Sequence, residues 1–496
     1  MIYDIWSITT SDRDLLGAFL LREKNDAIHL MWRHLEENEG ITDFDLMIKI
    51  FGKADSKNYR ILKGKFEHTL LKCLIVQNTS DERTPKRVLN YFEVQRNILA
   101  ANILLNKKKR NAAINILESV IDISLKYHMT EFVILASRQL AWHYGITSYN
   151  KYKFNLYSNI LNNSIEIQSK ELLAEQFSRE LQTRNARLAS NPSQEDKLMA
   201  KNYSNILNSF THIHSFTFLY NKYLVNAIQF EYSEDFKGLL SLSEAAIEQF
   251  ESPDLKANFV LDAINIRKIY ALIRLDNFIE ADKVGWNILI NSYSTYIFWF
   301  RVAYYIIKVR IYLKDYNGAL NLLIDVFNQK YFKKLPLAYQ ELFETKLGYM
   351  HLLIRSKLIE TEKKYIEILP SFKIAKFLNN IPVYSKDKRG INISILLLHI
   401  AFLLQKGDFE SVAEKIHSLQ SYSGRYLKHN DSFRSNCMIK MVIQMTKADF
   451  NPIRTARYTA DLRKQLGHVT LAGSGENIEV EIIPFEVLWD IMMKAL

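Results

Sequence analysis

Two short stretches decide the fold that this sequence predicts: LDNFIEA at residues 275–281 and LKDYNGAL at residues 313–320. Each has a polar turn with an aromatic residue, followed by alanine at the start of an apolar segment. Related stretches occur at 406–413 and, in a weaker form, at 233–239. Successive turn aromatics are separated by 42 and 38 positions in the first three copies along the chain. Such intervals are typical of helix–turn–helix repeats.

The segments after these turns have helical periodicity. Leu320, Leu323, Ile324 and Phe327 recur at the spacing that places apolar residues on one helix face. Antiparallel helices pack with their axes about 8–10 Å apart, which favours a small residue where they approach most closely. We therefore expect the alanines after the turns to lie in the seams between helices.

A resemblance follows from these motifs. Residues 111–145 and 272–330 resemble degenerate tetratricopeptide repeats, with the aromatic–x–x–Ala turn but without the full Trp–Leu–Gly–Tyr signature in any copy. The resemblance implies a right-handed superhelix whose concave face binds peptides or partner proteins. The chain also resembles helical-repeat proteins common in Bacteroidetes bacteria, most clearly at 377–390 and 433–437. That second resemblance implies a bacterial protein but no particular activity.

Composition agrees with an all-α fold. Among 496 residues there are 15 glycines and 8 prolines, together about 5% of the chain against roughly 12% in average proteins. Sandwiches, barrels and Rossmann-type sheets need more turns than this. Hydrophobic residues make up 48% of the chain, enough for a large core. The fold class predicted is an all-α solenoid of tetratricopeptide-like hairpins with a helical N-terminal domain and a short C-terminal strand plus helix.

Three regions are expected along the chain: a helical N-terminal domain at 1–90, helical repeats at 91–370, and a basic helical C-terminal region at 371–496. Within the repeats, residues 165–205 predict two long helices joined at Pro192, which we expect to project from the solenoid. Near the C-terminus, residues 477–483 alternate apolar and acidic side chains, which predicts a strand, and 487–493 predicts a closing helix.

Cysteine usage and hydropathy indicate a cytoplasmic protein with no membrane span. Two cysteines, Cys73 and Cys437, do not make a disulfide framework, and the first residues do not have the pattern of a signal peptide. The longest clean apolar stretch, residues 393–404, is shorter than the about 20 residues that a bilayer requires.

The net charge of +11 is concentrated near the C-terminus, where residues 425–464 include nine basic and three acidic residues. One interpretation is a footprint for nucleic acid or an acidic partner; the other is a set of solvated helix faces. The candidate partner or nucleic-acid contacts are Lys388, Arg389, Arg434, Lys440, Arg454, Arg457 and Arg463.

We find no catalytic or cofactor signature. The chain has no Walker loop, Rossmann fingerprint, Gly-x-Ser-x-Gly or His-Glu-x-x-His motif. His212 and His214, if helical, would point about 200° apart and could not chelate one ion. We therefore expect no catalytic residues, no metal site and no cofactor.

An aromatic run between Tyr293 and Tyr305 permits two interpretations, a stacking surface or core packing between hairpins. Core packing is favoured because few basic residues interleave with these aromatics. The function predicted is a non-enzymatic scaffold or adaptor that binds one or more proteins in a bacterial complex. The alternative is a nucleic-acid-associated regulatory or defence component that uses the basic C-terminal region.

Overall fold

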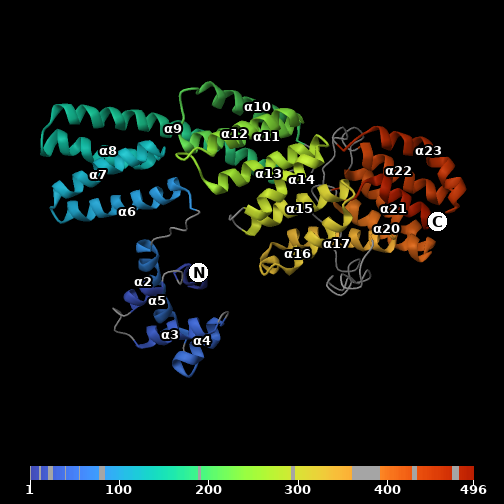
Figure 1. Ribbon diagram of the computed structural model, residues 1–496, viewed down its shortest axis with the longest axis horizontal. Coiled ribbons are helices and arrows are strands. Elements are labelled where there is room, and N and C mark those ends of the chain that lie inside the picture. The colour runs from blue at the N-terminus through green and yellow to red at the C-terminus, as the bar shows by residue number, and fades with distance from the viewer. Residues whose placement is uncertain are drawn as a thin grey trace. The chain divides into compact units, whose positions relative to one another are not determined.

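The protein is all-α in the computed structural model (Figure 1). The structure describes residues 2–9, 13–20, 26–38, 41–54, 56–77, 84–187, 192–291, 296–359, 391–426, 433–471 and 480–496. No strand occurs in these ranges, and none of the helices within them is long and apolar enough to cross a membrane.

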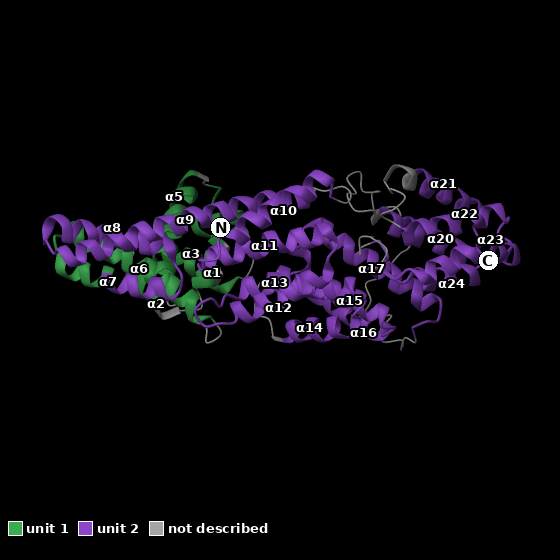
Figure 2. Cartoon of the chain, turned by 90° about the horizontal axis from the view of Figure 1, so that it is seen from above, with its two compact units in different colours: residues 1–117 green, residues 118–496 purple. Residues whose placement is uncertain are grey.

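The chain divides into two compact units, Met1–Leu117 and Glu118–Leu496 (Figure 2). In the first unit, α5 is the central helix, against which α1 to α4 pack. Phe66, Leu70 and Cys73 of α5 are fully buried in this core. The helices of this unit are α1 (Ile2–Thr9), α2 (Arg13–Leu20), α3 (Asp26–Glu37), α4 (Asp43–Phe51), α5 (Ser56–Val76), α6 (Lys86–Asn106) and the first half of α7 (Arg110–Lys126).

The second unit is a succession of helices in which most pack against the next one along the chain. After the end of α7 these are α8 (Thr130–Trp142), the π-helix η1 (His143–Thr147), α9 (Lys151–Arg187), α10 (Gln194–Ser209), α11 (Phe216–Ser233), α12 (Phe236–Phe250), α13 (Asn258–Arg274), α14 (Phe278–Asn291), α15 (Tyr296–Tyr312), α16 (Tyr316–Asn328), the short 3-10 helix η2 (Phe332–Lys334), α17 (Leu337–Arg355), α20 (Ile391–Lys406), α21 (Phe409–Tyr426), α22 (Phe433–Lys447), α23 (Pro452–His468) and α24 (Phe485–Lys494).

The four related stretches of the sequence each form the same turn between two helices. The residue two positions before the aromatic has a positive φ in every copy: Glu234, Asp276, Lys314 and Gly407, at 57°, 56°, 61° and 73°. The next residue's N–H donates to a carbonyl five residues earlier, as from Asp315 to Arg310 at 2.9 Å. This left-handed turn satisfies the last carbonyls of the first helix and reverses the chain.

A side-chain cap then starts the second helix of each pair. Asp235, Asp315 and Asp408 each accept a hydrogen bond from the backbone N–H three residues later, at 2.8, 2.9 and 3.1 Å. Asn277 makes the same bond at 3.4 Å. The polar residues of the repeated motif therefore end one helix and begin the next.

The seam prediction holds in two copies. Ala281 and Ala319, three positions after their turn aromatics, are fully buried. At the same offset Val412 and Leu239 are also buried, so the position is always in the core although its size varies. Ala413, which the motif singled out in the third copy, is exposed.

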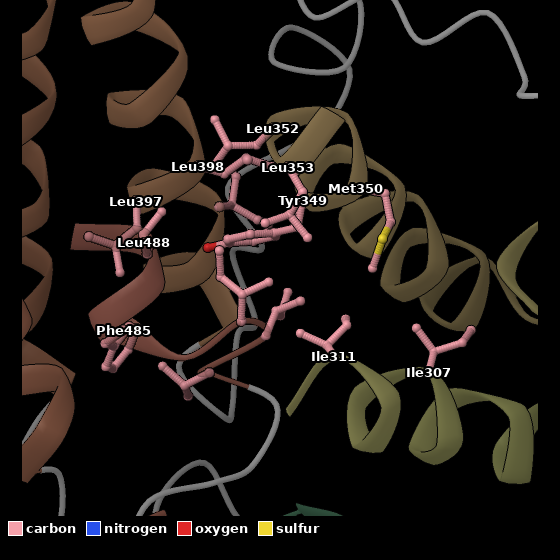
Figure 3. Close-up of a cluster of buried hydrophobic side chains, with 14 of the residues drawn as sticks. Ile307, Ile311, Tyr349, Met350, Leu352, Leu353, Leu397, Leu398, Phe485 and Leu488 are labelled. Carbon is pink, nitrogen blue, oxygen red and sulfur yellow. The ribbon is translucent and has the colours of Figure 1, made fainter. Parts of the chain in front are cut away.

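The aromatic run of α15 packs in the core. Phe298, Phe300 and Tyr304 are buried and belong to the large cluster that continues to the C-terminus. Figure 3 shows part of this cluster, where Tyr349 of α17 lies among leucines of α17, α20 and α24. The core-packing interpretation is therefore confirmed for these residues, whereas Tyr293 lies outside the described residues.

Three expectations require correction. Val480–Ile483 form turns and bends rather than a strand, and Glu481 is as buried as its apolar neighbours; residues 477–479 lie outside the described residues. Helices α9 and α10 exist as predicted, but they pack on α11 through a shared core rather than projecting. His212 and His214 lie in the connection between α10 and α11, not on a helix.

Candidate partner-binding surfaces

The candidate basic contacts do not form one surface. Lys388 and Arg389 lie outside the described residues. Arg434 is 4% exposed and lies in the core. Lys440 of α22 is exposed, as are Arg454, Arg457 and Arg463 of α23.

Arg434 is the centre of a buried ionic network. Its guanidinium donates to both carboxylate oxygens of Glu481, at 2.8 and 2.6 Å, and to Glu486 at 2.7 Å. It also donates to the backbone oxygens of Leu466 and Val469 at the end of α23. Burial alone would lower the pKa of Arg434, but the hydrogen bonds with both glutamates raise it above its usual value. Arg434 is therefore removed from the set of candidate contacts, because each nitrogen of its guanidinium already donates a hydrogen bond within the protein.

Glu481 also ties this network to α15. Its backbone oxygen accepts from Lys308 Nζ at 2.6 Å and from the Tyr312 hydroxyl at 3.2 Å. Its side chain accepts a further bond from the N–H of Phe485 at the start of α24. The chain between Val480 and Pro484 is thus held by polar contacts from three helices, which explains why a buried glutamate is tolerated there.

The exposed arginines of α23 are divided between helix faces. Arg454 and Arg463 lie about 180° apart at 100° per residue. Arg454 pairs with Asp449 at 3.6 Å and Arg463 with Asp490 at 2.6 Å. A continuous row of phosphate contacts requires cations on one face, and Arg463 lies outside the face that Arg454 and Arg457 share.

A groove lies between α23 and α24, with a volume of about 450 Å³. Ala456, Thr459 and Ala460 of α23 and Trp489 and Met493 of α24 line it, with Arg463 and Lys464 at its rim. We call this feature the α23–α24 groove.

A second surface lies where α8 passes through η1 into α9. Trp142, Ile146, Tyr149 and Tyr152 are more than half exposed, and Tyr149 and Tyr152 reach 73% and 76%. We call these four residues the aromatic corner. The four residues lie within 11 consecutive positions, 142–152. Several exposed large apolar side chains close together mark binding sites more often than single exposed residues do.

A polar cluster holds the backbone segments that carry the aromatic corner. One carboxylate oxygen of Glu118 accepts hydrogen bonds from Tyr144, Lys153 and Tyr157, at 2.9, 2.8 and 3.0 Å. The rings of Tyr144 and Tyr157 stack 5.8 Å apart, and Lys153 lies 4.6 Å from the centre of the Tyr144 ring. These contacts tie η1 to the first turns of α9 and to the end of α7.

Close backbone packing adds to this rigidity at Gly145. A Cβ at this position would lie 2.9 Å from the ring of Phe154, closer than carbon atoms approach without a shift. Glycine therefore lets the π-helix lie directly against a side chain in the first turn of α9. Such π-turns are frequent at functional sites.

Hydrogen bonding within this cluster shifts the pKa values of its members. Burial would raise the pKa of Glu118, but hydrogen bonds from Lys153, Tyr144 and Tyr157 hold it below its usual value. Its hydrogen bond with Glu118 raises the pKa of Lys153, while burial and the same carboxylate raise that of Tyr157. Each of these pKa values moves away from neutral pH, whereas a general acid or base works best with a pKa near the operating pH. The geometry is that of a structural clamp.

Within the described ranges, no group of three or more His, Cys, Asp or Glu side chains is placed to hold a metal ion. Both cysteines are buried.

The aromatic corner was not predicted from the sequence, although residues 149–154 read YNKYKF, with aromatics and lysines interleaved just before and within the start of α9. That spacing is the signal that could have found it.

Comparison with known proteins adds no relative: no family model, curated protein or solved structure matches this chain.

Proposed function

We propose that this protein is a scaffold or adaptor that binds a partner protein through the aromatic corner. The observation that supports the proposal is the exposure of Trp142, Ile146, Tyr149 and Tyr152 on a backbone held by the Glu118 cluster. Tryptophan and tyrosine supply much of the binding energy at protein interfaces. A rigid frame lowers the entropy lost when such a surface binds.

The helical hairpins support the same proposal. We infer that they continue as a tetratricopeptide-like solenoid, an architecture in which stacked repeats present extended binding surfaces. A partner then needs no catalytic residue from this chain. The division of exposed arginines between faces of α23, and the burial of Arg434, favour a protein partner over nucleic acid.

The proposal is tested by affinity purification of the full chain from the cells that naturally produce it. The test variant combines Tyr149→Ser with Tyr152→Ser. The matched control combines Ile279→Ser with Ile290→Ser, two side chains of α14 that are 75% and 61% exposed. Each sample is purified both with and without nuclease treatment.

We expect a protein that the native chain and the control retain and the Tyr149/Tyr152 variant loses. Thermal midpoints equal to that of the native chain show that both variants are folded. Retention of the same proteins by both variants would contradict the proposal, and loss of the partner on nuclease treatment would favour nucleic acid.

A further inference from the structure

The α23–α24 groove combines an apolar floor with a cationic rim. Ala456 and Ala460 lie one helical turn apart and leave the side of α23 open above Trp489 and Met493. Trp489 itself is 1% exposed, so it closes the floor without projecting. The volume of about 450 Å³ is within the range of roughly 300–1,000 Å³ found for ligand pockets.

The rim of the groove carries positive charge in a defined position. Arg463 of α23 donates a hydrogen bond to Asp490 of α24, with its Nη2 atom 2.6 Å from the Asp490 Oδ1 atom. Lys464 beside it is exposed, and among the described residues no carboxylate pairs with it. Arg457 lies on the same helix face as Lys464, seven residues earlier, and is also exposed.

Helix α23 as a whole has a cationic, open surface. It has four arginine or lysine side chains against one carboxylate, Asp461. Only Thr455, Thr459 and Leu466 of its 17 residues are buried. Arg454 and Arg463 pair with aspartates outside the helix, Asp449 and Asp490, whereas Arg457 and Lys464 have no ion pair among the described residues. These two cations attract an acidic ligand, and the apolar floor selects one that also carries an apolar side chain.

A protein segment fits this combination better than a nucleic acid does. Stacking of bases requires exposed aromatic faces, whereas only 1% of the Trp489 surface is exposed. Tight binding of a nucleic acid also requires several cations along one backbone track, whereas only Arg463 and Lys464 line this groove.

We propose that the α23–α24 groove binds an acidic segment of a partner protein. An apolar side chain of that segment lies against Met493, Ala456 and Ala460, and its carboxylates pair with Lys464, Arg457 and the remaining N–H groups of Arg463. This site is independent of the aromatic corner, so either proposal can fail alone.

The test is binding of the full chain to an array of short synthetic peptides. Acidic peptides carry Leu, Phe or Ser at a central position, and matched peptides carry Gln and Asn in place of Glu and Asp. Two variants act on the groove: Ala460→Trp fills it and Lys464→Gln removes a rim charge. Their controls are Ala413→Trp on α21 and Lys283→Gln on α14, both exposed.

We expect acidic peptides with central Leu or Phe to bind, with about tenfold weaker binding to each groove variant, which corresponds to about 1.4 kcal/mol. Both controls should bind as the native chain does. The proposal is overturned if no acidic peptide binds better than its neutral match, or if Ala460→Trp leaves binding unchanged. Tighter binding of single-stranded DNA, lost in the same groove variants, would assign the groove to nucleic acid instead.

Discussion

Replacing Arg434 with methionine tests whether the ionic network stabilises the C-terminal helices. The substitution keeps an unbranched apolar stem but leaves the carboxylate of Glu481, which is 0% exposed, without its two guanidinium bonds. It also removes the donors to Glu486 and to the backbone oxygens of Leu466 and Val469. Removing one partner of a buried ion pair costs about 3–5 kcal/mol.

Amide hydrogen exchange gives the assay, because it reports the opening free energy of individual elements. A loss of about 3–5 kcal/mol predicts exchange roughly 10²- to 10⁴-fold faster in peptides from α22 and α24, since each 1.4 kcal/mol is a factor of ten. Peptides from α12 and α13 should change far less.

A double-mutant cycle separates the ion pair from simple loss of packing. Glu481→Leu combined with Arg434→Met should recover much of the protection lost in either single variant, because no buried charge is left alone. The control, Arg454→Met, removes an exposed pair with Asp449 and should alter exchange by no more than a few-fold. Unchanged protection in Arg434→Met, or purely additive losses in the double variant, would refute this reasoning.

Three further predictions follow from buried or half-buried positions in the second unit. Ala281→Trp and Ala319→Trp should each destabilise the chain by about 1–3 kcal/mol or more through overpacking, and equal thermal midpoints with the native chain would contradict the seam assignment. Burial raises the pKa of Glu171 despite hydrogen bonds from Ser215 and Thr130, so its ionisation destabilises the fold as pH rises above 4.5; Glu171→Gln should therefore raise the thermal midpoint more at pH 7 than at pH 4. Burial lowers the pKa of His351 and of His399 to about 4. Stability should therefore fall as pH drops from 6.5 towards 4, by up to about 1.4 kcal/mol per pH unit for each histidine, and a flat pH profile over that window would count against half-buried neutral imidazoles.

The helical hairpins could be predicted because their determinants are local. The turn at 313–316 contains its own helix end, its left-handed residue Lys314 and its cap Asp315 within four positions. The buried alanine follows at a fixed offset from Tyr316. Every part of this pattern is visible in a short window of sequence, so no tertiary information is needed.

The buried ionic network could not be predicted in the same way, because its partners are distant along the chain. Arg434 meets Glu481 and Glu486 only after 47 and 52 residues. A count of charges in a window includes Arg434 with the surface cations and omits both glutamates. The same distance explains the strand prediction, since alternation at 477–483 is typical of a half-buried strand, whereas Glu481 faces an arginine inside the core.

The aromatic corner was missed for a different physical reason. A count of aromatics treats Tyr144, Tyr157 and Tyr152 alike, yet Tyr144 and Tyr157 are buried against Glu118 and Tyr152 is 76% exposed. Tyr152 and Tyr157 lie five residues apart on α9, which turns them about 140° from one another, so that one faces Glu118 and the other faces solvent. In the sequence, η1 is marked by Gly145 beside aromatic residues, because a glycine there permits the close approach of Phe154. The residues that hold this surface and the residues exposed on it are therefore neighbours in sequence. Gly145→Ala should displace η1 from Phe154, and we expect it to weaken partner binding as much as the loss of Tyr149 or Tyr152 does.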